Sequence, residues 1–246
     1  MKILFSPSEE KNLIYKDKNN SYLLFMQSLL FNNLYNFRKD VLNQYLDFLI
    51  NANSNDIARI LGSKKVNLDI LSACNNIPYA NTIESIFLYN GVAFKALDIN
   101  TLPKDSVDYL LNNVIIFSNL FGAIRAKDKI PYYKLKQNEK FGKYNISSFY
   151  NGFKNELDKY LKNEEVLDLR AEIYIKAYSP NIPTTIVEFY KNNKKVSHHS
   201  KLYRGILLRE IALKKQLDIC NLDFKNFKLC DVKKIELKTI LKYEII

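Results

Sequence analysis

The hydrophobic and polar positions of this chain follow two periods. Apolar side chains recur every three to four residues from about Tyr22 to Asn51, which predicts two helices that break near Asn36. The same period predicts a helix at Ile146–Leu161. Shorter helices are predicted at Ile57–Leu61, after Gly62 as far as Leu71, at Thr82–Tyr89 (as a helix or another buried run) and near Val107–Leu111.

Strands are predicted where apolar residues run without interruption. These runs are Lys2–Phe5, Val114–Phe117 and Val166–Leu169. A hairpin is predicted from Thr185–Tyr190 to Lys195–Ser197 over a polar turn, and the alternation in Asp231–Ile246 predicts strand at the C-terminus. Strands and helices do not alternate strictly, and there is no internal repeat or clean linker. We therefore expect one α+β domain over residues 1–246, with a mixed sheet surrounded by helices.

The stretch VSHHSKLYRGILLREIA, Val196–Ala212, changes from extended chain to a predicted helix. Its apolar arc consists of Leu202, Tyr203, Ile206, Leu207 and Ile211, and its opposite side carries Lys201, Arg204 and Arg209. Gly205 removes a side chain from that basic side, where another backbone or an anion could come close. The residues before the helix, Ser197 to Ser200, precede free N–H groups that favour anions. Two interpretations stay open: a phosphate-facing helix, or an ordinary amphipathic helix with a solvated basic side.

The charge balance narrows the class of partner. The chain has 246 residues, a net charge of +11 and a pI of about 9.3, which favours nucleic acid or phosphorylated metabolites. The alternative is compositional bias, because the chain is rich in Lys, Asn, Ile and Tyr, as an AT-biased genome would produce.

The cysteines and the apolar runs bear on the compartment. The chain has an odd number of cysteines, Cys74, Cys220 and Cys230, and no pair of them has a CxxC spacing. We therefore expect no disulfide framework, and we expect the protein to reside in the reducing cytoplasm. The opening MKILF is too short for a signal peptide. No apolar run approaches the roughly 20 residues that cross a bilayer, so we expect no membrane span.

Two segments carry candidate binding chemistry. The loop Ser6–Lys11 joins hydroxyls, carboxylates and an amine after a strand end, where ligand contacts are common; the alternative is a solvated surface loop. In the segment Ala123–Lys143, cations alternate with aromatic rings that could stack on bases. The cations are Arg125, Lys127, Lys129, Lys134, Lys136, Lys140 and Lys143, and the rings are Tyr132, Tyr133 and Phe141. The alternative is a basic hairpin whose tyrosines pack inward.

The remaining candidate catalytic or metal-binding residues do not match the motifs of a common enzyme class. Asp168 and Arg170 lie on one face at a strand end, as a ligand-orienting pair or, more simply, a structural ion pair. His198 and His199 diverge in direction and make a poor metal site. We find no Cys/His cluster, P-loop, GxGxxG or GxSxG, so we expect neither a metal site nor a cofactor.

Taken together, several motifs resemble those of the YaaA family of bacterial peroxide-stress proteins. The motifs are SPSEEK at Ser6–Lys11, TIESIFLYNGVAFKALD at Thr82–Asp98, FSNLFGAIRAKDKIPYYKLK at Phe117–Lys136, LDLRAEIY at Leu167–Tyr174 and VSHHSKLYRGILLR at Val196–Arg209. The chain departs from the family pattern at Glu10, Asn90, Phe94, Asn119, Ala126 and Lys134. Order and spacing agree from residue 3 to about residue 210.

The resemblance implies a compact α+β domain in the cytoplasm that acts in resistance to hydrogen peroxide. It also implies DNA binding through a basic cleft, a lowering of free iron and less oxidative DNA damage. The family is described with an element like a helix-hairpin-helix, and its counterpart here is Asp56–Leu71, around Gly62.

Two main hypotheses follow. The first is a stress protein that binds double-stranded or structured DNA through one electropositive cleft. Its expected phosphate contacts are Ser6, Lys11, Arg125, Lys134, Arg170, His198, Lys201, Arg204 and Gly205. The second is an enzyme acting on a nucleotide or small phosphorylated substrate, with Glu9, Asp168 and His198 as catalytic candidates, because carboxylates repel phosphate unless they orient cations or exchange protons. Direct iron sequestration is a weaker third hypothesis without a recognisable ligand set.

Overall fold

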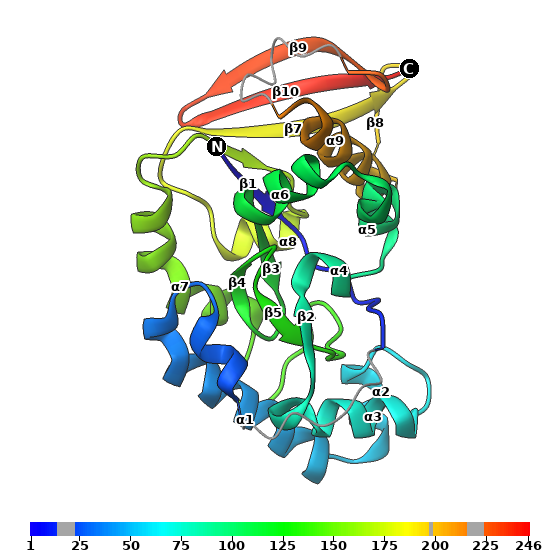
Figure 1. Cartoon of the computed structure of the whole chain (residues 1–246), viewed down its shortest axis with the longest axis vertical. Coiled ribbons are helices and arrows are strands. Elements are labelled where there is room, and N and C mark those ends of the chain that lie inside the picture. Colours follow the sequence, from blue (N-terminus) through cyan, green and yellow to red (C-terminus); the bar gives the residue numbers. More distant parts are fainter. Residues whose placement is uncertain (14–22, 197–198, 216–223) are drawn as a thin grey trace.

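The core of the protein is a mixed sheet in the order β4-β3-β1-β6-β7-β10-β9, with β8 paired to β7 (Figure 1). The computed structural model describes residues 1–13, 23–196, 199–215 and 224–246. The strands of this sheet are β1 (Lys2–Phe5), β3 (Val114–Ser118), β4 (Gly122–Arg125), β6 (Val166–Asp168), β7 (Thr184–Lys191), β8 (Lys194–Lys195), β9 (Phe227–Ile235) and β10 (Lys238–Ile245). Strands β3, β1, β6, β7 and β10 are parallel, whereas β4, β8 and β9 pair antiparallel with their neighbours. A separate ribbon pairs β2 (Thr82–Glu84) with β5 (Lys129–Pro131).

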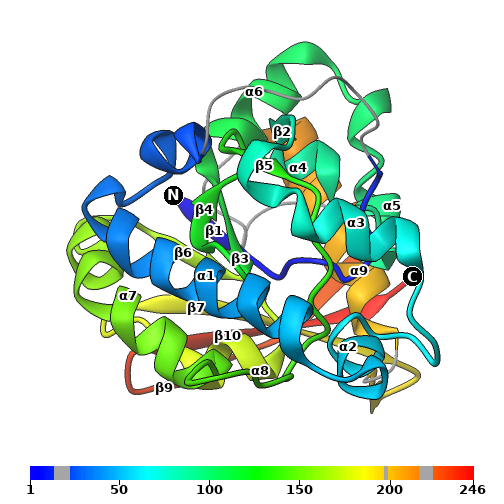
Figure 2. The same ribbon diagram turned by 90° about the horizontal axis from the view of Figure 1, so that it is seen from below.

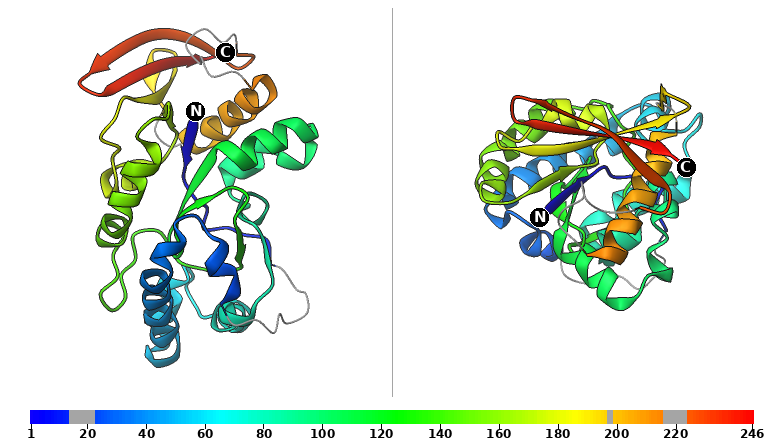
Figure 3. Two further views of the ribbon diagram at one scale, coloured as in Figure 1. Left: turned by 60° about the vertical axis from the view of Figure 1, so that its left-hand side comes forward. Right: turned by 90° about the horizontal axis from the view of Figure 1, so that it is seen from above.

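Helices cover both faces of the sheet. They are α1 (Tyr35–Asn51), α2 (Ser54–Ile60), α3 (Leu68–Asn75), α4 (Ser85–Leu88), α5 (Val92–Leu97), α6 (Lys104–Asn113), α7 (Ile146–Leu161), α8 (Glu172–Ala177) and α9 (Ser200–Lys214). Short 3₁₀ turns lie at Leu24–Ser28, Asn32–Leu34, Ile77–Tyr79 and Ile99–Thr101. Helices α5, α6 and α9 gather on one side of the sheet, and α7 and α8 lie on the other (Figures 1 and 3). No helix in the described ranges combines the length and apolar character needed to cross a bilayer.

The apolar runs of the sequence form the buried strands because helices cover them on both faces. Every residue of β3 is buried, and so are Ile3, Leu4 and Phe5 in β1. The strands predicted at Lys2–Phe5, Val114–Phe117 and Val166–Leu169 are therefore confirmed, as is the α+β class with a mixed sheet. The helix predicted at Ile146–Leu161 is α7.

Both predicted C-terminal β segments are present, but the second strand of the hairpin is Lys194–Lys195. It shares only Lys195 with the predicted strand Lys195–Ser197, of which Ser197 lies outside the described residues. Strands β7 and β8 form the expected hairpin, and Asn192 and Asn193 in its turn both have positive φ, 52° and 61°. Such angles are typical of a tight hairpin turn. The run Asp231–Ile246 was expected to be strand, and it forms most of a second hairpin in which β9 turns back into β10.

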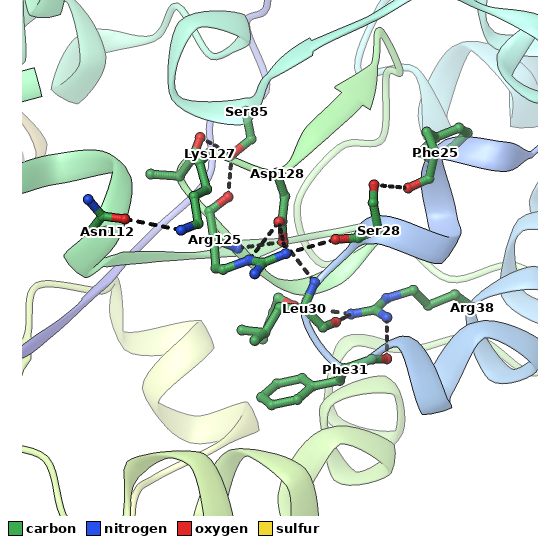
Figure 4. A network of polar contacts seen from close by, with 12 residues as sticks. Phe25, Ser28, Leu30, Phe31, Arg38, Ser85, Asn112, Arg125, Lys127 and Asp128 are labelled. Carbon is green, nitrogen blue, oxygen red and sulfur yellow. Dashed lines mark hydrogen bonds and ion pairs between the residues drawn. The ribbon is translucent and has the colours of Figure 1, made fainter. Parts of the chain in front are cut away.

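The helix predicted from Tyr22 to the break near Asn36 is wrong for the part that the structure describes. Leu23 and Phe31 have positive φ, 51° and 61°, and only 3₁₀ turns form between them and α1. Tertiary contacts explain the difference. The buried guanidinium of Arg38 donates hydrogen bonds to the carbonyls of Leu30 and Phe31, and the Leu30 backbone amide donates to the Asp128 carboxylate at 2.9 Å. These bonds, drawn in Figure 4, replace the hydrogen bonds that a helix would use.

Candidate functional site

A pocket of about 380 Å³ opens at the carboxyl ends of β1 and β6. Its wall consists of residues 5–10, Gly62, residues 91–94, Lys134, Gln137, Leu169, Ala171, Tyr174, Lys201 and Arg204. The chain passes from β1 first to β3 on one side and later to β6 on the other, so the strand order reverses at this point. Ligands of open α/β sheets commonly bind at such a reversal. Helices α5, α8 and α9 contribute residues to the wall, and Gly62 follows α2. Helices α5 and α9 lie together on one side of the molecule (Figures 1 and 2).

The Ser6–Lys11 loop forms one wall of the pocket and is anchored at several points. The Ala171 amide donates to Ser6 Oγ at 2.7 Å, and the Asn90 amide donates to the Glu10 carbonyl at 2.9 Å. Gly91 allows the loop to pass close to α5, since a Cβ there would lie 2.0 Å from Ser8 Oγ. The loop is therefore held between the end of β6 and the start of α5, and it is not a free surface loop.

Three cations from distant parts of the sequence meet at this pocket. Lys134 follows β5, and Lys201 and Arg204 belong to the first turns of α9. Lys201 is exposed, whereas Arg204 is half-buried. Burial lowers the pKa of Arg204, and the nearby Asp168 carboxylate opposes that shift. All three side chains were among the expected phosphate contacts.

Gly205 and Arg209 attach α9 to α5. A Cβ on Gly205 would lie 2.1 Å from the Ala93 carbonyl oxygen, so another backbone occupies the space that the glycine leaves. Arg209 donates to the carbonyls of Leu97 and Asp98, both at 2.8 Å, at the end of α5. Gly205, which was expected to contact phosphate, is buried in a contact between two helices, and Lys201 and Arg204 lie in the same helix.

Lys11 follows the pocket-lining residues 5–10 in the chain and is not itself among the residues that line the pocket. Its Nζ donates to the Ser8 carbonyl at 2.8 Å and lies 3.9 Å from the centre of the Tyr133 ring. Burial, followed by the charge of Lys134, lowers the pKa of Lys11 to about 7, although Cys74 and Glu9 oppose the shift.

Glu9 places a carboxylate in the pocket wall, as the enzyme hypothesis expected. The backbone N–H of Gln137 donates to Glu9 Oε1 at 2.9 Å, and this bond holds the Glu9 side chain in position. Glu10, next to it, forms an exposed ion pair with Lys95 at 3.2 Å. The wall therefore combines cations with carboxylates.

Asp168 and Arg170 form a buried ion pair and do not line the pocket. The pair is bidentate, with Arg170 Nη2 at 2.6 Å and Nε at 2.8 Å from the carboxylate oxygens. Arg170 also donates to the carbonyls of Tyr174 and Tyr178 and lies 4.1 Å from the centre of the Phe117 ring. This geometry is that of the structural ion pair, the simpler of the two interpretations, and the roles expected of Arg170 in phosphate binding and of Asp168 in catalysis stay predictions.

Arg125 is likewise absent from the pocket wall. Its guanidinium pairs with Asp128 at 2.6 Å and donates to the Ser28 carbonyl at 2.7 Å, where it helps to anchor the segment before α1 (Figure 4). In the same basic segment Tyr132, Tyr133 and Phe141 are buried, at 7%, 0% and 3% exposure. These rings pack inward and are not available to stack on bases.

His198 lies outside the described residues, and His199 is an exposed residue at the start of α9. The sequence analysis missed Gln137, for which no pattern exists, and Tyr174, which was present in the LDLRAEIY motif but was not singled out. Within the described ranges, no three His, Cys, Asp or Glu side chains are arranged to hold a metal ion.

Comparison with known proteins agrees with the family resemblance. An uncharacterized protein of Campylobacter jejuni is 42% identical over 253 residues, which cover 100% of this chain and 98% of that protein. A UPF0246 protein of Fusobacterium nucleatum is 28% identical, covering 86% and 85% of the two chains. A family model described as "Peroxide stress protein YaaA" matches residues 1–232. The chain therefore belongs to the YaaA family of peroxide stress proteins.

Proposed function

We propose that this protein binds DNA during peroxide stress and thereby limits iron-dependent oxidative damage to it. The observation that supports DNA binding is the convergence of Lys134, Lys201 and Arg204 on one open pocket. Membership of a peroxide-stress family supports the physiological setting.

The chemistry of the pocket suits phosphate. Ammonium and guanidinium groups are the usual partners of phosphate oxygens, and an arginine can bind two oxygens of one phosphate. The net charge of +11 adds a long-range attraction that increases the rate of encounter with a polyanion. Because Tyr132 and Tyr133 are buried, binding is expected to depend on phosphates and not on base stacking.

Fluorescence anisotropy with labelled duplex, single-stranded and bubble-containing DNA tests this proposal. Lys134→Ala and Lys201→Ala should each weaken binding severalfold, to a similar degree for every DNA sequence. Lys162→Ala is the matched control, since this exposed lysine lines a separate pocket beside α7. Equal affinity for all four proteins would remove the pocket from the DNA interface.

A second candidate function is an enzyme that acts on a nucleotide or a small phosphorylated substrate. The observation that favours it is the Glu9 carboxylate in the wall of a pocket of small-ligand size. Glu9 would then orient a cationic group or move a proton. Incubation with a panel of nucleotides, followed by phosphorus NMR, would reveal turnover that Glu9→Gln abolishes. Absence of turnover across the panel would leave DNA binding as the only proposed function.

A further inference from the structure

Lys11 holds its ammonium group in a site without a carboxylate partner. The Nζ atom donates to the Ser8 carbonyl at 2.8 Å and faces the rings of Tyr133 and Tyr89, with centres at 3.9 and 5.1 Å. Among the ion pairs of the described residues, none includes Lys11. Backbone and ring faces stabilise a cation less than a carboxylate does.

The groups around Lys11 give it little compensating charge. Burial, and after it the charge of Lys134, lowers the pKa of Lys11 to about 7, and the opposing effects of the Cys74 thiol and of Glu9 are smaller. Burial raises the pKa of Tyr133 to about 12 and that of Tyr89 well above its ordinary value, so both hydroxyls are neutral. They bond to each other at 3.0 Å. Glu10 is engaged with Lys95. Lys11 is therefore about half neutral at pH 7.

An anion bound at Lys134 would favour the protonated form of Lys11. One negative charge offsets the charge of Lys134 and relieves its repulsion of Lys11. A second negative charge provides the counter-charge that Lys11 itself lacks. A ligand must also overcome the Glu9 carboxylate in the pocket wall. A phosphate monoester carries close to two charges at pH 7.5, because its second pKa is about 6, whereas a phosphodiester carries one.

We propose that the Lys11–Lys134 pair makes this pocket selective for a terminal phosphate monoester, at the end of a nucleotide or a nucleic-acid strand, over an internal phosphodiester. This selectivity rests on the proposed function only in that phosphate binds in this pocket. In this proposal Lys134 contacts the phosphate, and Lys11 adds its positive charge without lining the pocket. Binding of the dianion is accompanied by uptake of a proton at Lys11 Nζ.

Isothermal titration calorimetry of the full chain with AMP and with its 5′-methyl ester tests the proposal. At pH 7.5 AMP should bind about tenfold more tightly than the singly charged ester. Titrations at pH 7.5 in two buffers of different ionisation enthalpy should show that AMP binding is accompanied by uptake of about half to three quarters of a proton, because about three quarters of Lys11 is neutral at that pH. A 5′-phosphorylated oligonucleotide and its 5′-hydroxyl form, measured in the same way, separate a strand end from a free nucleotide as the source of the phosphate.

Two variants at one position distinguish this role from a structural one. Lys11→Met should reduce the preference for AMP over its ester to about twofold or less and abolish proton uptake. Lys11→Arg should keep the preference and still abolish uptake, since arginine does not titrate near pH 7. Thermal unfolding of both variants checks that they are folded.

The outcomes separate this inference from the proposed function. If AMP, its ester and both oligonucleotides bind equally tightly and without proton uptake, the selectivity is wrong while phosphate binding stands. If none of them binds, or if Lys134→Ala leaves their binding unchanged, the pocket is not a phosphate site and both proposals fail.

Discussion

At the scale of single residues, the structure divides the charged motif side chains into two groups. Asp168 pairs with Arg170, and Asp128 pairs with Arg125. The arginines also donate to backbone carbonyls and the carboxylates accept backbone amides, so these side chains hold the fold around the pocket. Lys134, Lys201 and Arg204 face the pocket and are the residues proposed to bind phosphate. Charged residues from the same set of family motifs are therefore found both in buried ion pairs and in the pocket wall.

The buried pair of Asp168 and Arg170 leads to a prediction about stability. Arg170→Met removes one partner and leaves a carboxylate that is only 3% exposed without its counter-charge. Removing one partner of a buried ion pair typically costs about 3–5 kcal/mol of the free energy of unfolding. Urea unfolding at pH 7 should show a loss of this size. Lys176→Ala, which breaks the exposed pair with Glu172, is the control and should have little effect. A loss for Arg170→Met as small as that of the control would contradict the structural role.

Lys11 leads to a prediction about pH. Its pKa in the folded protein, about 7, lies below the ordinary value of 10.5. Between these values the unfolded chain binds more protons than the folded chain, so the contribution of Lys11 to the free energy of unfolding rises with pH. Below about pH 7 both states hold the proton, and the folded state carries the full cost of burying a charged amine.

The variant Lys11→Met, which keeps a long side chain without the amine, isolates this contribution. Its stability relative to the native protein should be highest at pH 6 and should decline steadily by pH 9. Urea unfolding of both proteins at several pH values in this range measures the difference. A difference that does not change with pH would show that Lys11 titrates near its ordinary value.

At the scale of elements, the contact between α5 and α9 positions the cations. The turn of α9 that carries Lys201 and Arg204 faces the pocket because Gly205, in the same helix, lies against the backbone of α5. Arg209 then fixes the far end of α5 through the carbonyls of Leu97 and Asp98. The basic side of α9 is therefore a packing surface along much of its length and opens only at its N-terminal end.

Gly205→Ala tests this contact. In an exposed helix, alanine in place of glycine stabilises by about 1 kcal/mol. Here the new Cβ would lie 2.1 Å from the Ala93 oxygen, so the two helices must separate, and we expect a loss of about 1–3 kcal/mol instead. Ser147→Ala, at an exposed position of α7, serves as the control for helix propensity. If urea unfolding shows that Gly205→Ala is stabilised like an ordinary helix position, the close contact is not present in solution.

The elements differ in how far the sequence could predict them. Strands β1, β3 and β6 were predictable because their apolar runs are short, uninterrupted and followed by polar residues. Helix α7 was predictable because its period of 3.6 is clear. The segment 23–34 was not, since bonds to Arg38 and Asp128 override a helical pattern, and no local signal reports a partner about 100 residues away.

The site was predictable only in part. The family motifs pointed to Ser6, Glu9, Lys134, Lys201 and Arg204, all of which line the pocket. The motifs could not show that Arg170 and Arg125 are turned into the protein, because a basic residue in a motif has the same appearance whether it binds a ligand or a buried carboxylate. Gln137 was not predictable, since it reaches the pocket through the fold of its loop alone.

At the scale of the whole molecule, the net charge of +11 has two possible meanings. Much of it lies outside the pocket, for example on Lys228, Lys233 and Lys234 of the exposed strand β9. Charge spread in this way is compatible with compositional bias. The proposed function instead assigns a specific part of the binding energy to the cations at the carboxyl edge of the sheet.

The salt dependence of DNA binding measures how much these cations contribute. The slope of log affinity against log salt counts the phosphates that the protein neutralises, at about 0.9 per contact on a duplex. We expect a steep linear fall for the native protein, and a slope that is shallower by about one contact for Lys201→Ala but unchanged for Lys162→Ala. Equal slopes for all three proteins, or binding too weak to measure at physiological salt, would contradict a phosphate-binding pocket and would leave the positive charge as a property of composition.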